Sequence, residues 1–214
     1  RVLFRSGEQW VVDGDPTEGA LVVVAMKAGL DPDFEAKNCP RSDVIPFESE
    51  HRFMATLHHN HDGRGFIYVK GAPERILEMC DRQRGYGADE LLDAEYWQKR
   101  MEEIAARGQR ILALASRPAN DSHRELRFQD VEKNLVLIGL FGLADPPRQE
   151  AIEAVTQCRS AGIRVKMITG DHAATARAVA AQLGLENTDV VLTGRELDAL
   201  DGPQLASRSQ DVNV

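Results

Sequence analysis

The last third of the chain alternates apolar strands with helices, and this order limits the folds open to it. A continuous apolar run at residues 135–143 predicts a buried strand. A helix is expected after Pro147, and residues 163–168 and 189–192 read as further strands separated by a helix at residues 173–183. Parallel strands need helical crossovers. The order therefore predicts a parallel, Rossmann-like α/β arrangement.

The first two thirds of the chain show a different pattern, in which strand-like segments follow one another through turns. A polar turn at residues 58–65 leads into a returning strand that ends at Gly71. Residues 117–133 lose apolar content and separate the two patterns. We therefore expect an α+β domain with an antiparallel sheet and flanking helices at residues 1–133, joined to a partial α/β domain at residues 134–214.

Composition excludes several classes of function. A net charge of −8 argues against a nucleic-acid partner, and no apolar run is long enough to span a bilayer. Three scattered cysteines indicate reduced thiols and no metal site. The run His58, His59, His61 and Asp62 is expected to be an exposed hairpin turn, because its spacing places no set of metal ligands on one face.

The segment Asp13-Gly14-Asp15-Pro16-Thr17 admits two interpretations. Paired aspartates followed by threonine resemble the nucleophile motif of haloacid-dehalogenase-type phosphatases, with Asp13 as nucleophile and Asp15 as acid/base. The same residues also form a helix start, with Asp15 as N-cap, Pro16 in the first turn and Glu18 at the capping-box position. Only three apolar residues precede Asp13, which favours the helix start and keeps the phosphatase as the alternative.

Six motifs occur in an order that resembles the P-type cation-transporting ATPases, in particular the calcium-ATPase-like branch. They are GDPTEGAL (14–21), PFESEHRFM (46–54), YVKGAPERIL (68–77), GQRILALA (108–115), GLADPPR (142–148) and MITGD (167–171). The resemblance runs from about Gly7 to Val214. It implies a nucleotide-binding (N) domain followed by part of a phosphorylation (P) domain.

The resemblance also implies a function. Pumps of this family couple ATP hydrolysis, through an aspartyl-phosphate, to cation transport across a membrane. The DKTGT motif that carries the phosphorylated aspartate does not occur in this sequence, nor do the later lysine and the GDG-type magnesium motif. We therefore expect a cytoplasmic piece of an integral membrane protein that binds ATP or ADP without turnover. Its partners would be the actuator, the remaining phosphorylation domain and the transmembrane domain.

Family motifs assign roles around the base of the nucleotide. By resemblance, Phe47 stacks on adenine and Glu18 reaches the adenine amino group. Lys70 would line the floor of the pocket, and Gly71 would let the base approach the backbone, where a Cβ atom would clash. An aromatic face with apolar walls and few polar groups suits such a ligand.

The phosphate side is assigned to cations and to the second domain. Arg110 by resemblance contacts the phosphates and helps to bridge the two domains. Arg52 stands where the family usually has lysine, and its planar guanidinium leaves the geometry of that contact open.

Residues near the ends of the later strands are assigned to the transferred phosphate. By resemblance, Thr169 and Gly170 hold the γ-phosphoryl group, while Asp145, Arg148 and Asp171 organise ATP and Mg²⁺. Asp171 also fits a simple helix N-cap. The sheet of this part lacks strands, so we expect a less protected tail after about Gly194.

Overall fold

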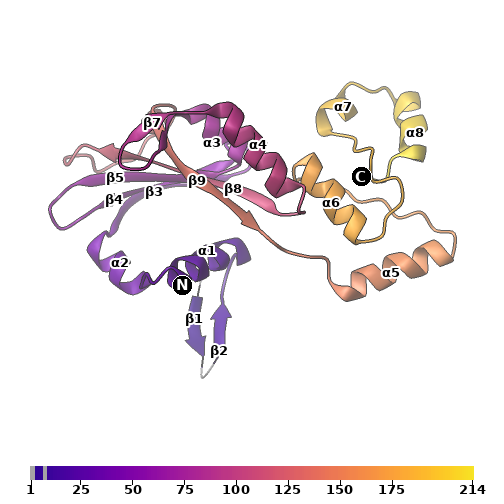
Figure 1. Ribbon diagram of the computed structural model, residues 1–214, viewed down its shortest axis with the longest axis horizontal. Coiled ribbons are helices and arrows are strands. Elements are labelled where there is room, and N and C mark those ends of the chain that lie inside the picture. Colours follow the sequence, from indigo (N-terminus) through magenta and orange to yellow (C-terminus); the bar gives the residue numbers. More distant parts are fainter. Residues whose placement is uncertain (1–2, 7–8) are drawn as a thin grey trace. The chain divides into compact units, whose positions relative to one another are not determined.

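The computed structural model describes residues 3–6 and 9–214, with side chains from residue 11 onward. The chain forms two compact units (Figure 1). One contains the residues up to Ala94 together with Leu112–Leu143, and the other contains Glu95–Ile111 and Ala144–Val214. In the described part of the chain, no helix is both long and apolar enough to cross a membrane.

The first unit is built on a seven-stranded sheet with the strand order β3-β4-β5-β8-β9-β6-β7. The strands are β3 (Arg41–Glu48), β4 (Phe53–His59), β5 (Gly65–Gly71), β6 (Cys80–Arg84), β7 (Asp89–Leu91), β8 (Arg110–Ala119) and β9 (Leu135–Leu143). Strands β3, β4, β5 and β8 pair antiparallel in turn, as do β6 and β7, whereas β6 and β9 are parallel. The expected antiparallel sheet is therefore present, and β6 and β9 add a parallel pair to it.

Residues 135–143 form the predicted strand, β9. This strand belongs to the seven-stranded sheet and not to a separate parallel sheet. Because β9 pairs with β6, it belongs to the first unit. The expected domain boundary after residue 133 falls before this strand, whereas the compact units separate after Leu143.

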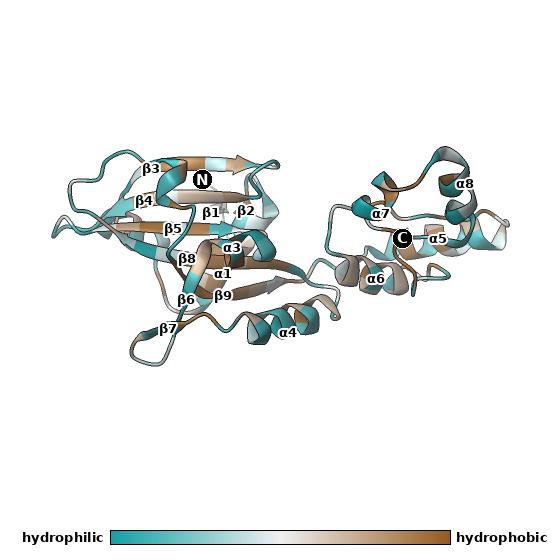
Figure 2. Ribbon diagram, turned by 90° about the horizontal axis from the view of Figure 1, so that it is seen from above, coloured by the Kyte–Doolittle hydropathy of each residue, from teal (hydrophilic) through white to brown (hydrophobic). Residues whose placement is uncertain are grey.

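The core lies on one face of the sheet. Phe53, Ala55 and Leu57 alternate along β4 and are buried, and Ala55 and Leu57 pair in register with Val69 and Ile67 of β5. Helix α3 (Pro73–Met79) contacts β5, β6 and β9. Figure 2 shows β9 and part of β5 as hydrophobic, whereas other strands have mixed colours. Alternation leaves the residues between these on the opposite face, which is less buried.

Helices α1 (Pro16–Lys27) and α2 (Pro32–Asn38) follow a two-stranded antiparallel sheet of β1 (Leu3–Ser6) and β2 (Gln9–Val12). The Asp15 Oδ1 atom accepts a hydrogen bond from the Thr17 amide at 2.6 Å, so the predicted N-cap is present. Asp31 caps α2 in the same way through the amides of Asp33 and Phe34. A short 3-10 helix, η1 (Phe128–Asp130), lies in the polar segment before β9.

The second unit contains five helices among the described residues: α4 (Ala94–Ala105), α5 (Gln149–Ser160), α6 (Ala173–Gln182), α7 (Gly194–Asp198) and α8 (Gly202–Asp211). Helices α5 and α6 lie where the sequence predicts them. The residues after Gly194 form α7 and α8, and Val212 and Asn213 beyond them are buried. Neither helix contains a buried residue, and the expected lower protection of this tail stays a prediction.

The two later strands of the sequence prediction are not formed. Residues 163–168 and 189–192 are not strands, so the expected Rossmann-like sheet is absent from the described residues. A strand requires a paired neighbour. The apolar run at residues 135–143, which was expected to pair with these segments, is strand β9 of the seven-stranded sheet. Ile163 and Ile168 are consequently exposed. The Met167 amide donates a hydrogen bond to the Asn213 carbonyl, and the Leu192 amide donates one to the Val214 carbonyl.

Candidate functional site

Lys70 lies on the open face of the large sheet. It is flanked in register by Met54 of β4 and Leu114 of β8. Its ammonium group donates to both carboxylate oxygens of Glu18 on α1. The Lys70 side chain is 19% exposed and that of Glu18 is 39% exposed. This ion pair is therefore partly desolvated, which strengthens it relative to a pair on an open surface.

Glu18 reaches this position because of where α1 begins. Asp15 caps the helix, so Glu18 falls in the first turn. The sequence predicts a capping-box role for Glu18, but its carboxylate turns to Lys70. The helix start thus places an acidic side chain beside the sheet.

A small cavity of about 110 Å³ adjoins Lys70. It is lined by Met54, Thr56, Tyr68, Val69, Lys70, Leu114, Ala115 and Ile138. Apolar walls with a few polar groups are typical of sites for small organic ligands. The volume is suited to part of a ligand, such as one planar ring.

The cavity wall includes Thr56 and Ile138, which lie outside the motifs of the sequence analysis, and Tyr68, which lies in a motif but was given no role there. Thr56 and Tyr68 face each other in register across β4 and β5. The spacing of Tyr68 and Lys70 already places both on one face of a strand. The strand register that adds Thr56 and Ile138 has no comparable local signal.

Phe47 lies on β3 with 58% of its surface exposed. The register of β3 and β4 shifts between Ile45 and Glu48, so Phe47 lies in an irregular part of the strand. It does not line the cavity beside Lys70. The structure therefore leaves this aromatic ring available at the surface.

Arg52 and Gly71 meet at the neighbouring ends of β4 and β5. Arg52 has a φ of 58°, and its carbonyl accepts a hydrogen bond from the Ala72 amide at 2.9 Å. A Cβ atom on Gly71 would lie 2.4 Å from the Arg52 carbonyl oxygen and 2.7 Å from Phe53 Cα. The space beside Gly71 is thus occupied by protein backbone.

A second cluster lies in the other unit and joins residues 61 apart in sequence. Arg110 contacts Asp171 through both Nε and Nη2, each 2.9 Å from Oδ1. The Thr169 hydroxyl donates to Asp171 Oδ2 at 3.0 Å and accepts from the Asp171 amide at 3.1 Å. His172, and not Asp171, is the N-cap of α6. The carboxylate of Asp171 is therefore engaged by a guanidinium and a hydroxyl.

Other predicted site residues lie outside this cluster. Gly170 is exposed and has open space where a side chain would project. Asp145 and Arg148 are exposed, and among the described residues neither side chain makes a hydrogen bond or an ion pair. Arg148 precedes α5 as its N-cap residue.

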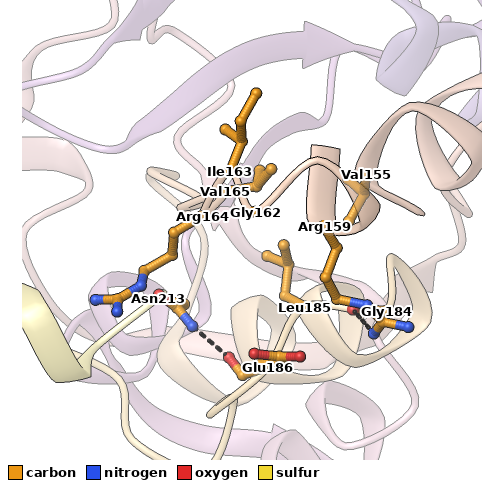
Figure 3. A pocket seen from close by; sticks show the side chains of 10 residues that line it. All are labelled: Val155, Arg159, Gly162, Ile163, Arg164, Val165, Gly184, Leu185, Glu186 and Asn213. Atoms are coloured by element: carbon orange, nitrogen blue, oxygen red, sulfur yellow. Dashed lines mark hydrogen bonds between the residues drawn. The ribbon is translucent and has the colours of Figure 1, made fainter. Parts of the chain in front are cut away.

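A larger cavity of about 250 Å³ lies in the second unit and contains none of the predicted site residues (Figure 3). Arg159 on its wall donates to the Gly184 carbonyl at 3.3 Å. The Asn213 amide group donates to the Glu186 carbonyl at 2.7 Å. These polar groups already have protein partners, so we do not assign a ligand to this cavity.

The histidines of the β4–β5 turn have protein partners. His58 Nδ1 lies 2.9 Å from the Cys39 carbonyl oxygen. His59 lies between the Ser42 hydroxyl, 2.7 Å from Nδ1, and Arg124, 2.8 Å from Nε2. In the part of the chain with described side chains, no three His, Cys, Asp or Glu residues gather as metal ligands.

Comparison with known proteins identifies one family that matches more than half of the chain. Residues 3–150 match the family described as P-type ATPase, cytoplasmic domain N. The chain belongs to the P-type cation-transporting ATPases. The family resemblance drawn from the motifs is thereby confirmed. Because the matching family is the N domain of these ATPases, this region is implied to bind nucleotide.

Several curated P-type ATPases are similar over nearly the whole chain. The cation-transporting ATPase pma1 of Synechocystis sp. is 43% identical over 215 residues, covering 99% of this chain and 24% of its own length. The probable cation-transporting ATPase F of Mycobacterium tuberculosis is 44% identical over 219 residues, with the same two shares. The calcium-transporting ATPase of Bacillus subtilis is 35% identical over 214 residues, covering 98% of this chain and 24% of its length. The chain thus spans about a quarter of these relatives.

Proposed function

We propose that the open face around Lys70 binds the adenine nucleotide of a cation-transporting pump. The supporting observation is the partly desolvated pair of Lys70 and Glu18 beside an apolar cavity. The cavity would receive the base, and Phe47 would cover it from the exposed side. Lys70 and Glu18 would then hydrogen-bond to the ring nitrogens and the amino group of adenine.

The phosphates of ATP are proposed to contact cations outside the cavity. Arg52 and Arg110 are the candidates, since guanidinium groups donate paired hydrogen bonds to phosphate oxygens. Arg110 is already bonded to a carboxylate of Asp171. A phosphate bound to Arg110 would therefore compete with this carboxylate.

We assign the second unit from Ala144 onward to the P domain, and keep β9 with the N domain because it is part of the large sheet. Thr169 and Gly170 would contact the γ-phosphate. Asp145 and Asp171 would supply oxygen donors of the kind that Mg²⁺ prefers.

The whole pump would transfer the γ-phosphoryl group to an aspartate and use this step to move a cation. The actuator, transmembrane and remaining P-domain parts would be its partners. The acceptor motif is not in this sequence, so we propose that the 214-residue chain binds ATP and ADP without sustained hydrolysis.

The test is an NMR titration of the chain with ATP. Lys70→Ala is expected to weaken binding about tenfold, the factor given by about 1.4 kcal/mol from a lost charge-assisted contact. Lys37→Ala, a charge control on α2, is expected to leave binding unchanged. Equal effects of the two substitutions would contradict the assigned site.

An ATP titration and a hydrolysis assay of Asp13→Asn distinguish the phosphatase alternative. Asp13 is exposed and follows a short strand of a two-stranded sheet, which is unlike a buried nucleophile. We expect Asp13→Asn to bind ATP as the wild type does. Magnesium-dependent hydrolysis of p-nitrophenyl phosphate that disappears in Asp13→Asn would instead favour the phosphatase.

A further inference from the structure

Arg52 has an unusual backbone conformation for its residue type. In the described part of the chain, the non-glycine residues with positive φ are Arg52, Asn134 and Asn187. Asparagine tolerates this left-handed region, whereas a long side chain costs free energy there. Such conformations persist when the surroundings determine them, and they concentrate at functional sites.

The turn between β3 and β4 imposes this conformation from one side. Glu48 and Phe53 pair across the turn. The Glu48 carbonyl accepts hydrogen bonds from the amides of His51 and Arg52, at 3.1 and 2.8 Å. These bonds define where the turn ends and how Arg52 enters β4.

The end of β5 imposes the conformation from the other side. The Ala72 amide donates to the Arg52 carbonyl, and Phe53 pairs in register with Gly71. A Cβ atom at Gly71 would overlap the Arg52 carbonyl oxygen at 2.4 Å. Because this neighbour is backbone, it cannot move aside as the tip of a side chain could.

The side of Gly71 that lacks a side chain is turned toward the backbone of Arg52 and Phe53. Gly71 belongs to the buried residues of β5, with Ile67 and Val69, while Lys70 projects to the opposite face. Its missing side chain therefore makes room for Arg52 and not for the base. Gly71 directly follows Lys70 and pairs across the sheet with Phe53, the residue after Arg52.

We propose that Gly71 is a positioning residue for Arg52, which it holds in the left-handed conformation that directs the guanidinium to the phosphates of the bound nucleotide. This inference rests on the proposed nucleotide site. It assigns the glycine to phosphate recognition through Arg52, and separates it from recognition of the base.

The test compares ATP with adenosine in NMR titrations of the full chain. The ratio of the dissociation constant of adenosine to that of ATP measures the contribution of the phosphates to affinity. Arg52→Asn keeps a residue that tolerates positive φ but removes the charge, and should lower the ratio about tenfold. Gly71→Ala should lower the ratio by a similar factor, with the affinity for adenosine changed less than twofold.

A matched control is available on the same strand. Gly65, at the other end of β5, is also crowded, with an added Cβ atom 3.0 Å from Ala119 Cβ and 3.2 Å from its carbonyl oxygen. Gly65→Ala should destabilise the sheet and leave the ratio unchanged. If Gly65→Ala lowers the ratio as much as Gly71→Ala does, the effect is general strain and the inference is wrong.

A second variant keeps the test decisive if Gly71→Ala does not fold. Ala72 has a φ of −57°, which proline can adopt, and Ala72→Pro removes the amide that holds the Arg52 carbonyl. It should lower the ratio in the same way. The ¹⁵Nε signal of Arg52 should shift with ATP and not with adenosine in the wild type, and should lose this response in Ala72→Pro.

The outcomes separate the inference from the proposed function. If wild-type chain binds ATP and Lys70→Ala weakens it, but Gly71→Ala reduces the affinities for ATP and adenosine equally, Gly71 serves the base and the inference alone is overturned. An unchanged ratio in both Gly71→Ala and Ala72→Pro overturns it too. If the wild type binds no ATP, the nucleotide site itself is refuted.

Discussion

Replacing Asp15 with alanine tests whether the segment that begins α1 is a helix cap. The Asp15 carboxylate accepts from the Thr17 amide at 2.6 Å in the first turn. Alanine removes this acceptor and also removes a negative charge from the positive end of the helix dipole. The first turn of α1 also carries Glu18, the partner of Lys70.

The expected loss is about 1 kcal/mol, the usual cost of replacing an aspartate N-cap by alanine. Asp15 is exposed, so burial adds little to this figure. Since about 1.4 kcal/mol corresponds to a factor of ten, the amides of α1 should exchange with solvent about fivefold faster in native-state hydrogen exchange.

The effect should depend on pH with a defined sign. The hydrogen bond from the Thr17 amide, followed by that from the Thr17 hydroxyl, lowers the pKa of Asp15 from 3.8. A lowered folded-state pKa means that the stabilisation is fully present above 3.8 and is lost as the pH falls through the folded-state value. The difference between wild type and Asp15→Ala should therefore disappear in strong acid.

Two substitutions serve as controls. Asp13→Ala removes an exposed carboxylate that does not cap α1, and should leave exchange unchanged. Asp31→Ala removes the cap of α2 and should affect that helix alone. If Asp13→Ala accelerates exchange in α1 as much as Asp15→Ala, or if Asp15→Ala has no effect at neutral pH, the capping argument is refuted.

Three further predictions concern burial and charge. Burial raises the pKa of the Cys80 thiol to about 12, so at pH 8 only about one molecule in ten thousand carries the reactive thiolate. Iodoacetamide should therefore label Cys80 more slowly than the less buried cysteines, and equal labelling rates would contradict this. Leu57→Ala should cost roughly 2–5 kcal/mol in urea unfolding because the side chain is fully buried, whereas Leu91→Ala at an exposed site should cost less than about 0.5 kcal/mol. Hydrogen bonds from the amides of Leu126 and then Val44 lower the pKa of the Asp43 carboxyl. The exchange protection of the Leu126 amide should therefore stay constant above pH 3.8 and fall as the pH drops through the lowered pKa. Protection that persists in acid would refute the role of this carboxylate.

Elements with clear start or end signals in the local sequence were predictable. Asp15 and Pro16 define the start of α1, and the alternation that ends at Gly71 defines β5. Strands β6 and β7 have no such pattern, because most of their residues are exposed and no apolar alternation marks them. Helix α2 was missed although Asp31 and Pro32 carry the same start signal as α1.

The later strands were predicted wrongly for a physical reason. The apolar character of residues 163–168 is compatible with a strand, but a strand also requires hydrogen-bonding partners that local sequence does not specify. The residues of the candidate site also divide into those that local sequence marks and those that only strand pairing brings together. Motifs identified Glu18 and Lys70 separately, while the register that brings Thr56 and Tyr68 to the cavity depends on how β4 and β5 pair.

The second unit is discontinuous in sequence, and this has a consequence for inheritance. Residues Glu95–Ile111, which contain Arg110, are encoded apart from Ala144–Val214, which contain Asp171. A genetic exchange between two related pumps with a single crossover between these segments would combine the arginine of one parent with the aspartate of the other. Such chimaeras should function when both parents share the spacing of this ion pair. We therefore expect the two segments to change together during divergence, although the strands β9 and most of β8 lie between them in the gene.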